Sequence, residues 1–295
     1  MSSRSYFCRI SLTLAKLGRL GCQQFCLTLF KFKLSRSNPR TFQLIRNGDA
    51  STLTSTNFNL TNPTVIYVMG FSEATTGPST TTIRDAYITR GAYNFIAVDW
   101  ARLIAFPWYI SAVRNTRYMG RRLAEFVQFL NTNGISAASL HVIGFSLGAE
   151  AAGFAGKALR RSGLALGRIT GLDPAYPGYS LTNSSGHLAK GDAMFVDVLH
   201  TNPGVFGFPQ AIGDVDFYVN PGKWIQPGCW VDELARNREL AYIYGCSHNR
   251  AWRYFAESVL DPAGFPATLC HRWNPPLPLC TFQTHGFMGF GARKP

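Results

Sequence analysis

The 295-residue chain lacks any apolar run long enough to cross a membrane. A helical span needs about 20 consecutive, mostly apolar residues, and every hydrophobic stretch here is interrupted well before that length. We therefore expect no transmembrane segment. The length suits one large α/β domain or two small ones, and a content of 46% hydrophobic and 14% aromatic residues can fill a sizeable core.

Acidic residues are absent from the first 46 positions, which carry nine of the 29 lysines and arginines. The remainder has 20 basic and 16 acidic residues, so most of the net charge of +13 belongs to the N-terminal part. No basic helix interleaved with aromatic residues follows it. We therefore expect no nucleic-acid binding.

The same N-terminal segment lacks the continuous apolar core and the small-residue cleavage site of a secretory signal peptide. Its arginine, serine and leucine content without acid resembles a mitochondrial presequence, and an atypical or mis-assigned start accounts for it equally well. We set residues 1–40 apart as a basic segment of uncertain processing. The folded domain is expected over residues 41–295.

The seven cysteines lack the spacing of a common zinc site. The four late ones predict two local disulfides, although four cysteines permit three pairings. Disulfides favour an oxidising compartment and conflict with mitochondrial targeting, so a secreted protein is predicted. The predicted pairs are Cys229 with Cys246 and Cys270 with Cys280, and the pairing of Cys8, Cys22 and Cys26 stays open.

Strand and helix patterns alternate from about residue 41, without an internal repeat. This alternation predicts a mainly parallel sheet with helices on both faces, in a single α/β domain. Past residue 200 the chain becomes loop-rich, and its tail from residue 262 is expected to be irregular. The patterns predict strands at 64–69, 94–98, 139–143, 168–172 and 194–199, and helices at 79–90, 108–130 (one long or two adjacent) and 250–260.

Residues 144–148 read Gly-Phe-Ser-Leu-Gly and lie between a predicted strand and a small-residue helical run. Strand, sharp turn and helix form the context of a nucleophile elbow. Such a turn forces its serine into a strained conformation, and the N-terminus of the following helix can stabilise an oxyanion. The pattern also occurs in ordinary flexible loops, so its flanks carry the prediction that Ser146 is a nucleophile.

A serine nucleophile needs a histidine base, which follows it in the chain order of this elbow. His248 is the leading candidate, because a disulfide at Cys246 and the N-terminus of a helix starting near Arg250 would fix its loop. The other histidines are His141, expected in the core, His187, expected to be exposed, His200, with a structural role preferred, and His271 and His285 in the tail.

The base needs an acid to orient it, and Asp173 stands directly after a predicted strand and before Pro174. A turn-forming aspartate is the plain alternative reading. The oxyanion hole requires two backbone N–H groups, predicted at Leu147 after the serine and at Phe71 after the first strand. The rival acids are Asp192, Asp197, Asp214 and Asp216.

A series of ordered motifs resembles the pancreatic lipase family, most of all its insect branch of neutral lipases and phospholipases A1. The resemblance covers about residues 41–290. The motifs are Ser37-Asn38-Pro39, Gly70-Phe71, Val98-Asp99-Trp100, Val142 to Ala149, Gly171 to Ala175, Val196 to Asn202, Asp216-Phe217-Tyr218, Gln226 to Cys229 and Cys246-Ser247-His248.

The resemblance implies an α/β-hydrolase fold, a triad of Ser146, Asp173 and His248, and an oxyanion hole at Phe71 and Leu147. It implies a fatty-acyl ester hydrolase acting on glycerolipids at a lipid–water interface. The short stretch between His200 and Asp216 resembles the phospholipase A1 members, so phospholipid is placed slightly ahead of triglyceride. A yolk-protein-like binding protein of the same fold is the alternative, although such proteins have lost the nucleophile.

The disulfide-bounded lid of the family matches the segment between Cys229 and Cys246. Its apolar positions can share one face of an interfacial helix, and a short surface helix that never moves is the alternative. The chain departs from the family pattern at Met69 and Glu150, where histidine is frequent. The acidic cluster that binds calcium in some relatives is largely missing around residues 187–192, so no structural calcium is expected. No other metal and no cofactor is expected. No C-terminal β-sandwich domain is expected either.

Overall fold

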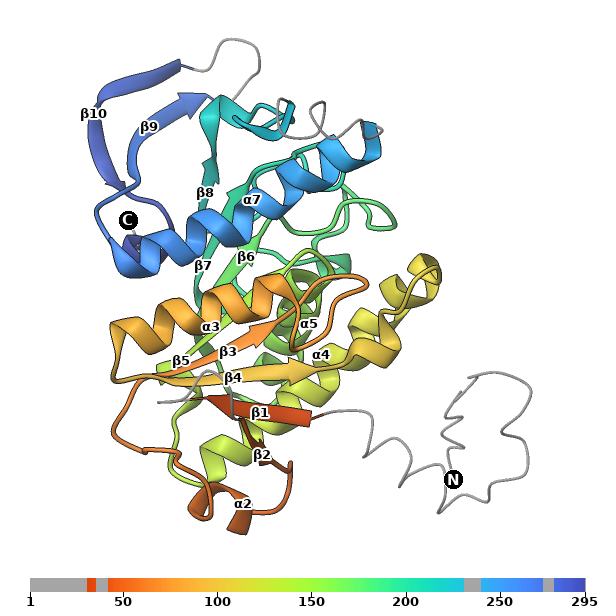
Figure 1. Ribbon diagram of the computed structural model, residues 1–295, viewed down its shortest axis with the longest axis vertical. Coiled ribbons are helices and arrows are strands. Elements are labelled where there is room, and N and C mark those ends of the chain that lie inside the picture. The colour runs from red at the N-terminus through yellow and green to blue at the C-terminus, as the bar shows by residue number, and fades with distance from the viewer. Residues whose placement is uncertain (1–30, 36–41, 231–239, 273–278, 295) are drawn as a thin grey trace.

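Eight strands form one sheet in the order β2-β1-β4-β3-β5-β6-β7-β8, and β9 and β10 form a separate hairpin (Figure 1). The computed structural model of the protein describes residues 31–35, 42–230, 240–272 and 279–294. The strands are β1 Lys31–Ser35, β2 Gln43–Ile45, β3 Thr64–Val68, β4 Asn94–Asp99, β5 Leu140–Phe145, β6 Leu166–Leu172, β7 Ala193–His200, β8 Val215–Tyr218, β9 Pro266–Arg272 and β10 Leu279–Phe287.

Two pairs of long helices flank the sheet. The α-helices are α2 Ser51–Thr54, α3 Pro78–Arg90, α4 Tyr109–Thr132, α5 Leu147–Arg161 and α7 Leu240–Leu260. The short 3₁₀ helices are η1 Ala101–Leu103, η2 Ala137–Ser139, η3 Ser184–Gly186, η4 Asn220–Gly222 and η5 Gly289–Gly291. Helix α3 packs against α7 on one face and α4 against α5 on the other (Figure 1). No helix in the described ranges is long and apolar enough to span a membrane.

Six neighbouring strands of the sheet are mutually parallel, which confirms the predicted mainly parallel sheet. In their order across the sheet they are β4, β3, β5, β6, β7 and β8. Strand β1 pairs antiparallel with β4, and β2 pairs antiparallel with β1. Strand β1 lies inside the segment that was set apart as residues 1–40. The sheet therefore begins before residue 41.

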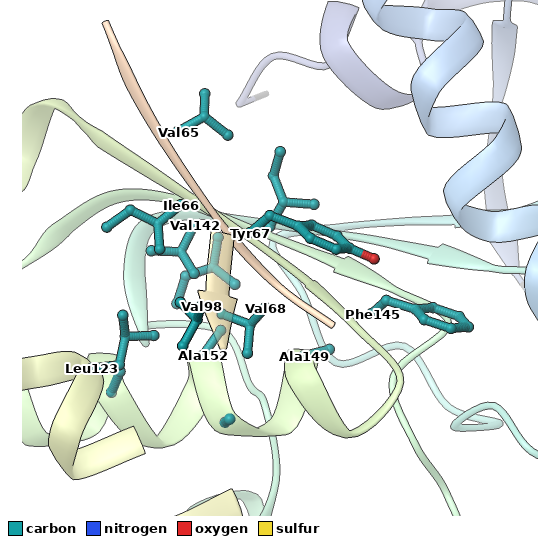
Figure 2. Close-up of a cluster of buried hydrophobic side chains, with 14 of the residues drawn as sticks. Val65, Ile66, Tyr67, Val68, Val98, Leu123, Val142, Phe145, Ala149 and Ala152 are labelled. Atoms are coloured by element: carbon teal, nitrogen blue, oxygen red, sulfur yellow. The ribbon is translucent and has the colours of Figure 1, made fainter. Parts of the chain in front are cut away.

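The central strands are buried on both faces, because helices cover the sheet on either side. All five residues of β3 are buried. In Figure 2, Val68 points toward Ala149 and Ala152 of α5. The next residue back, Tyr67, points the other way, and its hydroxyl hydrogen-bonds the Ser79 hydroxyl of α3 at 2.5 Å. This alternation follows from the two-residue period of a strand.

Three local expectations need revision or sharpening. The helical pattern at 108–130 forms one helix, α4, rather than two. Helix α7 starts at Leu240 instead of near residue 250, because packing against α3 outweighs the low helix propensity of glycine and asparagine within it. The tail is not irregular. Strands β9 and β10 pair there across the disulfide between Cys270 and Cys280.

Helices α4 and α5 approach each other closely at Gly120. A Cβ on this residue would overlap the Phe154 side chain and crowd the Ala151 carbonyl oxygen of α5. Only a residue without a side chain lets the two backbones come so near. The layer behind the sheet, and with it the position of α5, depends on this contact.

We expect Gly120→Ala to lower the free energy of unfolding by about 1–3 kcal/mol, because the added methyl group overpacks the α4–α5 contact. Gly245→Ala is the matched control, since nothing lies within 4 Å of a Cβ at this glycine of α7. That change should be neutral or stabilising by up to about 1 kcal/mol. Urea unfolding of the two variants measures the difference, and equal effects would contradict the packing argument.

Candidate active site

Ser146 occupies the sharp turn between β5 and α5. Its backbone has φ 54° and ψ −120°, a strained conformation for a residue with a side chain. Three main-chain hydrogen bonds hold it: its N–H donates to Leu172 (3.0 Å), and its carbonyl accepts from Ala149 (3.0 Å) and Ala175 (3.3 Å). The end of β6 and the start of α5 thus hold the serine in place.

Glycines on both sides of the serine make this turn possible. A Cβ on Gly144 would overlap the backbone of Gly148 and Ala149, and a Cβ on Gly148 would overlap the Val68 carbonyl oxygen. Gly70 is equally close, because a Cβ there would lie 3.1 Å from the Ser146 Cβ. The chain that leaves β3 therefore runs directly beside the serine.

Asp173 follows β6, as predicted, and is fully buried. Its Oδ1 accepts hydrogen bonds from the N–H groups of Thr201 (2.8 Å) and Asn202 (3.0 Å). Its Oδ2 lies 2.6 Å from Nδ1 of His248. A carboxylate in this position favours the histidine tautomer with hydrogen on Nδ1, which leaves Nε2 as a proton acceptor.

His248 lies inside α7, so the expected loop before a helix N-terminus is wrong. Its ring lies 4.7 Å from the ring of Phe145, the residue before the serine, and 5.8 Å from the exposed Phe206. Its carbonyl accepts from the Thr201 hydroxyl at 3.4 Å. The histidine is half-buried between the strand end that carries Ser146 and the loop after β7.

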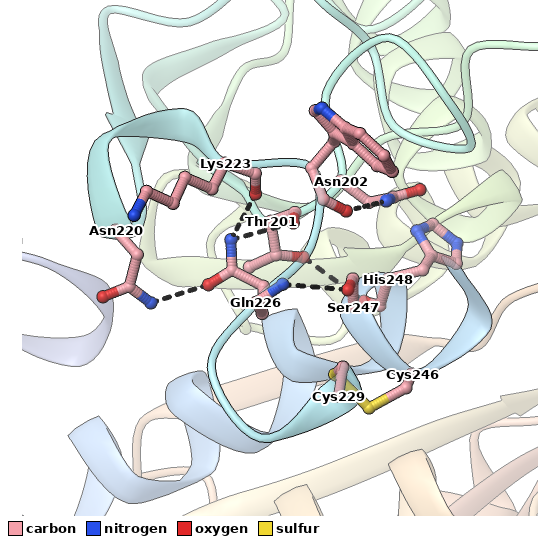
Figure 3. The surroundings of a disulfide bond; sticks show 10 residues. Thr201, Asn202, Asn220, Lys223, Gln226, Cys229, Cys246, Ser247 and His248 are labelled. Atoms are coloured by element: carbon pink, nitrogen blue, oxygen red, sulfur yellow. Dashed lines mark hydrogen bonds between the residues drawn. A yellow bond between two sulfur atoms is a disulfide. The ribbon is translucent and has the colours of Figure 1, made fainter. Parts of the chain in front are cut away.

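A buried glutamine organises the loops around His248, and sequence reasoning assigned it no role (Figure 3). The Gln226 side-chain amide donates to the carbonyls of Thr201 (3.0 Å), Val219 (3.3 Å) and Lys223 (2.7 Å), and its main-chain N–H donates to Ser247 (3.0 Å). Gln226 begins one of the motifs that resemble the lipase family, the stretch from Gln226 to Cys229. That motif was the sequence signal that could have identified this residue. The predicted disulfide between Cys229 and Cys246 lies beside it.

The two expected oxyanion donors follow the carboxyl ends of the neighbouring strands β3 and β5. Leu147 is the first residue of α5, and the first N–H groups of a helix have no partner within it. Phe71 follows Gly70 after β3, and its ring packs edge-on against Tyr109 at 5.1 Å. The next residue, Ser72, donates its N–H to the Ile104 carbonyl at 2.7 Å.

The rival acids are engaged elsewhere. Asp197 forms a buried ion pair with Arg168 at 2.7 Å, and Asp192 pairs with Lys157. Asp214 accepts from the Val196 N–H at 2.9 Å. Asp216 accepts from two main-chain N–H groups and from Nε2 of His200.

The other described histidine rings lie outside this constellation. His141 contacts the Thr170 hydroxyl at 2.8 Å, and burial lowers its pKa well below the usual range, as suits a core residue. Both ring nitrogens of His200 are bonded, to the Phe208 carbonyl and to Asp216, so its structural role is confirmed. The expectation that His187 is exposed is wrong. It is buried, because its Nδ1 bonds the Leu188 carbonyl and its ring lies over Phe208.

A comparison with known families matches the model described as Lipase over residues 20–275. The chain belongs to the lipase family. It is 36% identical over 254 residues to pancreatic lipase-related protein 2 of Bos taurus, covering 81% of this chain and 53% of the relative. Pancreatic triacylglycerol lipase of Sus scrofa is 36% identical over 240 residues, covering 77% and 52%.

These relatives confirm the resemblance to pancreatic lipases, and the chain spans about half of their length. A solved phospholipase/carboxylesterase from Dyadobacter fermentans is similar with a TM-score of 0.36 at 13% identity, covering 60% of this chain and 75% of that one. The lid expected between Cys229 and Cys246 falls mostly on residues 231–239, outside the described residues. Its last part, from Leu240, belongs to the backbone of α7.

One helical turn after Ser146, this lipase-family chain carries the fully buried Glu150. Its Oε2 accepts from the Leu188 N–H at 2.6 Å, while Oε1 has no hydrogen-bond partner among the described residues. Burial raises the pKa of this carboxyl to about 8, and the Leu188 bond and nearby Lys157 oppose the rise only in part. The acid therefore holds its proton near neutral pH.

Lys157, further along α5, secures the loop after η3. Its ammonium donates to the His187 carbonyl at 2.7 Å and pairs with the buried Asp192. Within the described ranges, no group of three or more histidine, cysteine, aspartate or glutamate side chains is placed to hold a metal. The expectation that no calcium binds stays a prediction.

We expect Glu150→Gln to remove a pH-dependent loss of stability. Below the ordinary carboxyl pKa of 4.5 both folded and unfolded states are protonated, so Glu150 costs nothing. Between that value and about 8 only the unfolded state ionises, so the stability of the wild type falls with rising pH. The variant should exceed the wild type by an amount on the order of a few kcal/mol above pH 8 and match it near pH 4.

Glutamine retains the carbonyl oxygen that accepts from Leu188, so the variant preserves the hydrogen bond. Glu125→Gln serves as the control, because Glu125 is an exposed acid of α4. Thermal melts from pH 4 to about pH 9 make the comparison. Parallel curves for wild type and the Glu150 variant would show that the buried acid does not carry the pH dependence.

Proposed function

We propose that the chain is a lipase-type serine ester hydrolase with Ser146 as nucleophile, His248 as base and Asp173 as the orienting acid. The observation that carries the proposal is that the two carboxylate oxygens of Asp173 bind different partners. One oxygen binds the loop after β7, and the other binds Nδ1 of His248 at 2.6 Å. The serine in its strained turn lies at the neighbouring strand end, which suits a triad.

In the proposed reaction, Nε2 of His248 takes the proton of the Ser146 hydroxyl as its oxygen attacks an acyl carbonyl. The carbonyl oxygen becomes an oxyanion, stabilised by the N–H groups of Leu147 and Phe71 and by the N-terminus of α5. The histidine then gives the proton to the departing alcohol, leaving an acyl-enzyme. Water activated by His248 releases the carboxylic acid and restores the serine.

The proposed substrate is a glycerolipid at a lipid–water interface, with phospholipid ahead of triglyceride. The segment between His200 and Asp216 supports this preference, because it is short and is held close to the core by hydrogen bonds. Its Phe208 N–H donates to the Pro174 carbonyl at 2.7 Å, and His200 bonds Asp216 across its base at 2.8 Å. We further propose that the lipase domain, predicted over residues 41–295, begins with β1 at Lys31, and that the protein is secreted, in keeping with the two disulfides.

Replacing the triad residues tests the mechanism. Ser146→Ala should abolish labelling by a serine-directed fluorophosphonate, because the attacking oxygen is gone. Asp173→Asn should lower kcat on a soluble ester by about 10⁴-fold, since the asparagine no longer favours the required histidine tautomer. Folding of each variant is checked by thermal melting.

The matched control for Asp173→Asn is Asp192→Asn, which removes a buried acid bonded to Lys157 and not to His248. It should leave kcat of the folded enzyme within a few fold. Labelling that persists in Ser146→Ala would overturn the proposed nucleophile. Absence of labelling in the folded wild type would favour a lipid-binding protein of the same fold.

Substrate preference is tested with sn-1- and sn-2-labelled phosphatidylcholine beside triolein. We expect fatty acid to be released faster from the phospholipid, and the two labels report which of its chains is cleaved. Quantifying released label at equal lipid surface area removes differences in dispersion. Release from triolein alone would reverse the proposed preference and leave the triad mechanism intact.

A further inference from the structure

The turn between η1 and α4, together with the first residues of α4, carries three of the four most exposed large apolar side chains in the described part of the molecule. Phe106 is 76% exposed, Trp108 69% and Ile110 61%. We call these three residues the aromatic tip. In Figure 1 the tip lies in the yellow segment at the margin of the molecule, past the end of β4. Clustered apolar exposure of this kind marks a surface that another molecule covers.

The structure presents the tip firmly. Ile104 before it and Ala112 after it are fully buried, so both ends are anchored in the core. Within the turn, the Trp108 N–H donates to the Ala105 carbonyl at 3.1 Å, and the Ala112 N–H donates to the Trp108 carbonyl at 2.9 Å. These hydrogen bonds order the backbone that carries the exposed side chains, which limits the backbone entropy lost on binding.

The tip adjoins the candidate active site on its oxyanion side. Tyr109, between Trp108 and Ile110, packs its ring on Phe71 at 5.1 Å and donates its hydroxyl to the Pro177 carbonyl at 2.9 Å. The Ile104 carbonyl accepts from Ser72, the residue after Phe71. A surface that receives the tip is thereby brought next to the proposed reaction centre.

Positive charge continues from the tip along α4. Arg114, Arg117 and Arg121 are all exposed and follow Ile110 at spacings of four, three and four residues. Residues at these spacings share one side of a helix. We call them the arginine stripe. No aspartate or glutamate occurs between Asp99 and Glu125, so no acid within this stretch offsets the stripe.

We propose that the aromatic tip and the arginine stripe together dock the protein on an anionic phospholipid bilayer. Tryptophan and phenylalanine side chains enter the interfacial region, and guanidinium groups bind headgroup phosphates. The combination of apolar anchor and aligned cations fits this surface better than a neutral lipid droplet, which offers the arginines no negative charge. The biological role of this docking rests on the proposed function. The docking itself does not, because binding to vesicles is measured without catalysis.

Vesicle co-sedimentation tests the apolar part, with Ser146→Ala in every sample so that lipid is not consumed. Phe106→Ala with Trp108→Ala should weaken binding to phosphatidylcholine–phosphatidylserine vesicles by about tenfold or more, because two interfacial anchors are lost. Leu60→Ala is the matched control. Leu60 is 67% exposed, and it lies before β3, at the opposite end of the parallel strands. Unchanged binding in the tip variant would overturn the proposal.

A second pair of variants tests the charge. Arg114→Gln with Arg121→Gln should weaken binding to the anionic vesicles by about tenfold or more and reduce its dependence on salt. Arg161→Gln with Arg293→Gln removes the same charge near the amino ends of the strands and should change binding little. Equal binding of the parent protein to pure phosphatidylcholine and to anionic vesicles would overturn the role of the stripe.

Hydrolysis of p-nitrophenyl butyrate, a soluble ester, separates docking from catalysis. When Ser146 is left unchanged, the tip and stripe variants should hydrolyse this soluble ester as fast as the parent protein but lose activity on anionic vesicles. Equal losses on both substrates would overturn docking as the function of the tip and assign it to the site through Tyr109. No turnover of the soluble ester by the unmodified protein would instead refute the proposed function, while vesicle binding would still decide the docking.

Discussion

The strained turn at Ser146 is the constraint on which the rest of the site depends. A residue with a side chain keeps a φ of 54° only if its surroundings leave it no alternative. Here the end of β6 and the first turn of α5 bond its backbone, and Gly144 and Gly148 remove the side chains that would block the approach. The strain at Ser146 is thus offset by hydrogen bonds and close packing from segments outside the turn.

A second constraint joins segments that are distant in sequence. Burying the Asp173 carboxylate would be costly unless its oxygens were hydrogen-bonded. Two N–H groups after β7 and one ring nitrogen from α7 meet that need. Gln226 then bonds the carbonyls of the surrounding loops. The acid therefore defines where the loop after β7 and helix α7 meet, and His248 stands at that meeting point.

The proposal that the protein docks on a lipid surface rests on where charge and apolar side chains lie on the molecule. The candidate site has exposed aromatic side chains on two sides. Phe206 lies against His248, and the aromatic tip lies beyond Phe71. The buried pair of Lys157 and Asp192 braces the loop after η3 from behind. The ion pair that supports the loop thus lies inside the fold, while the exposed apolar side chains lie around the candidate site.

The sequence by itself determined the parallel sheet and the positions of Ser146 and Asp173 at strand ends, because strand periodicity and turn chemistry are local properties. It also pointed to His248 and to both disulfides. Only the tertiary structure decided that His248 sits within α7, that His187 is buried and that the tail forms a hairpin. Those features depend on contacts between segments far apart in the chain, and such contacts outweigh the weak propensities that a local pattern expresses.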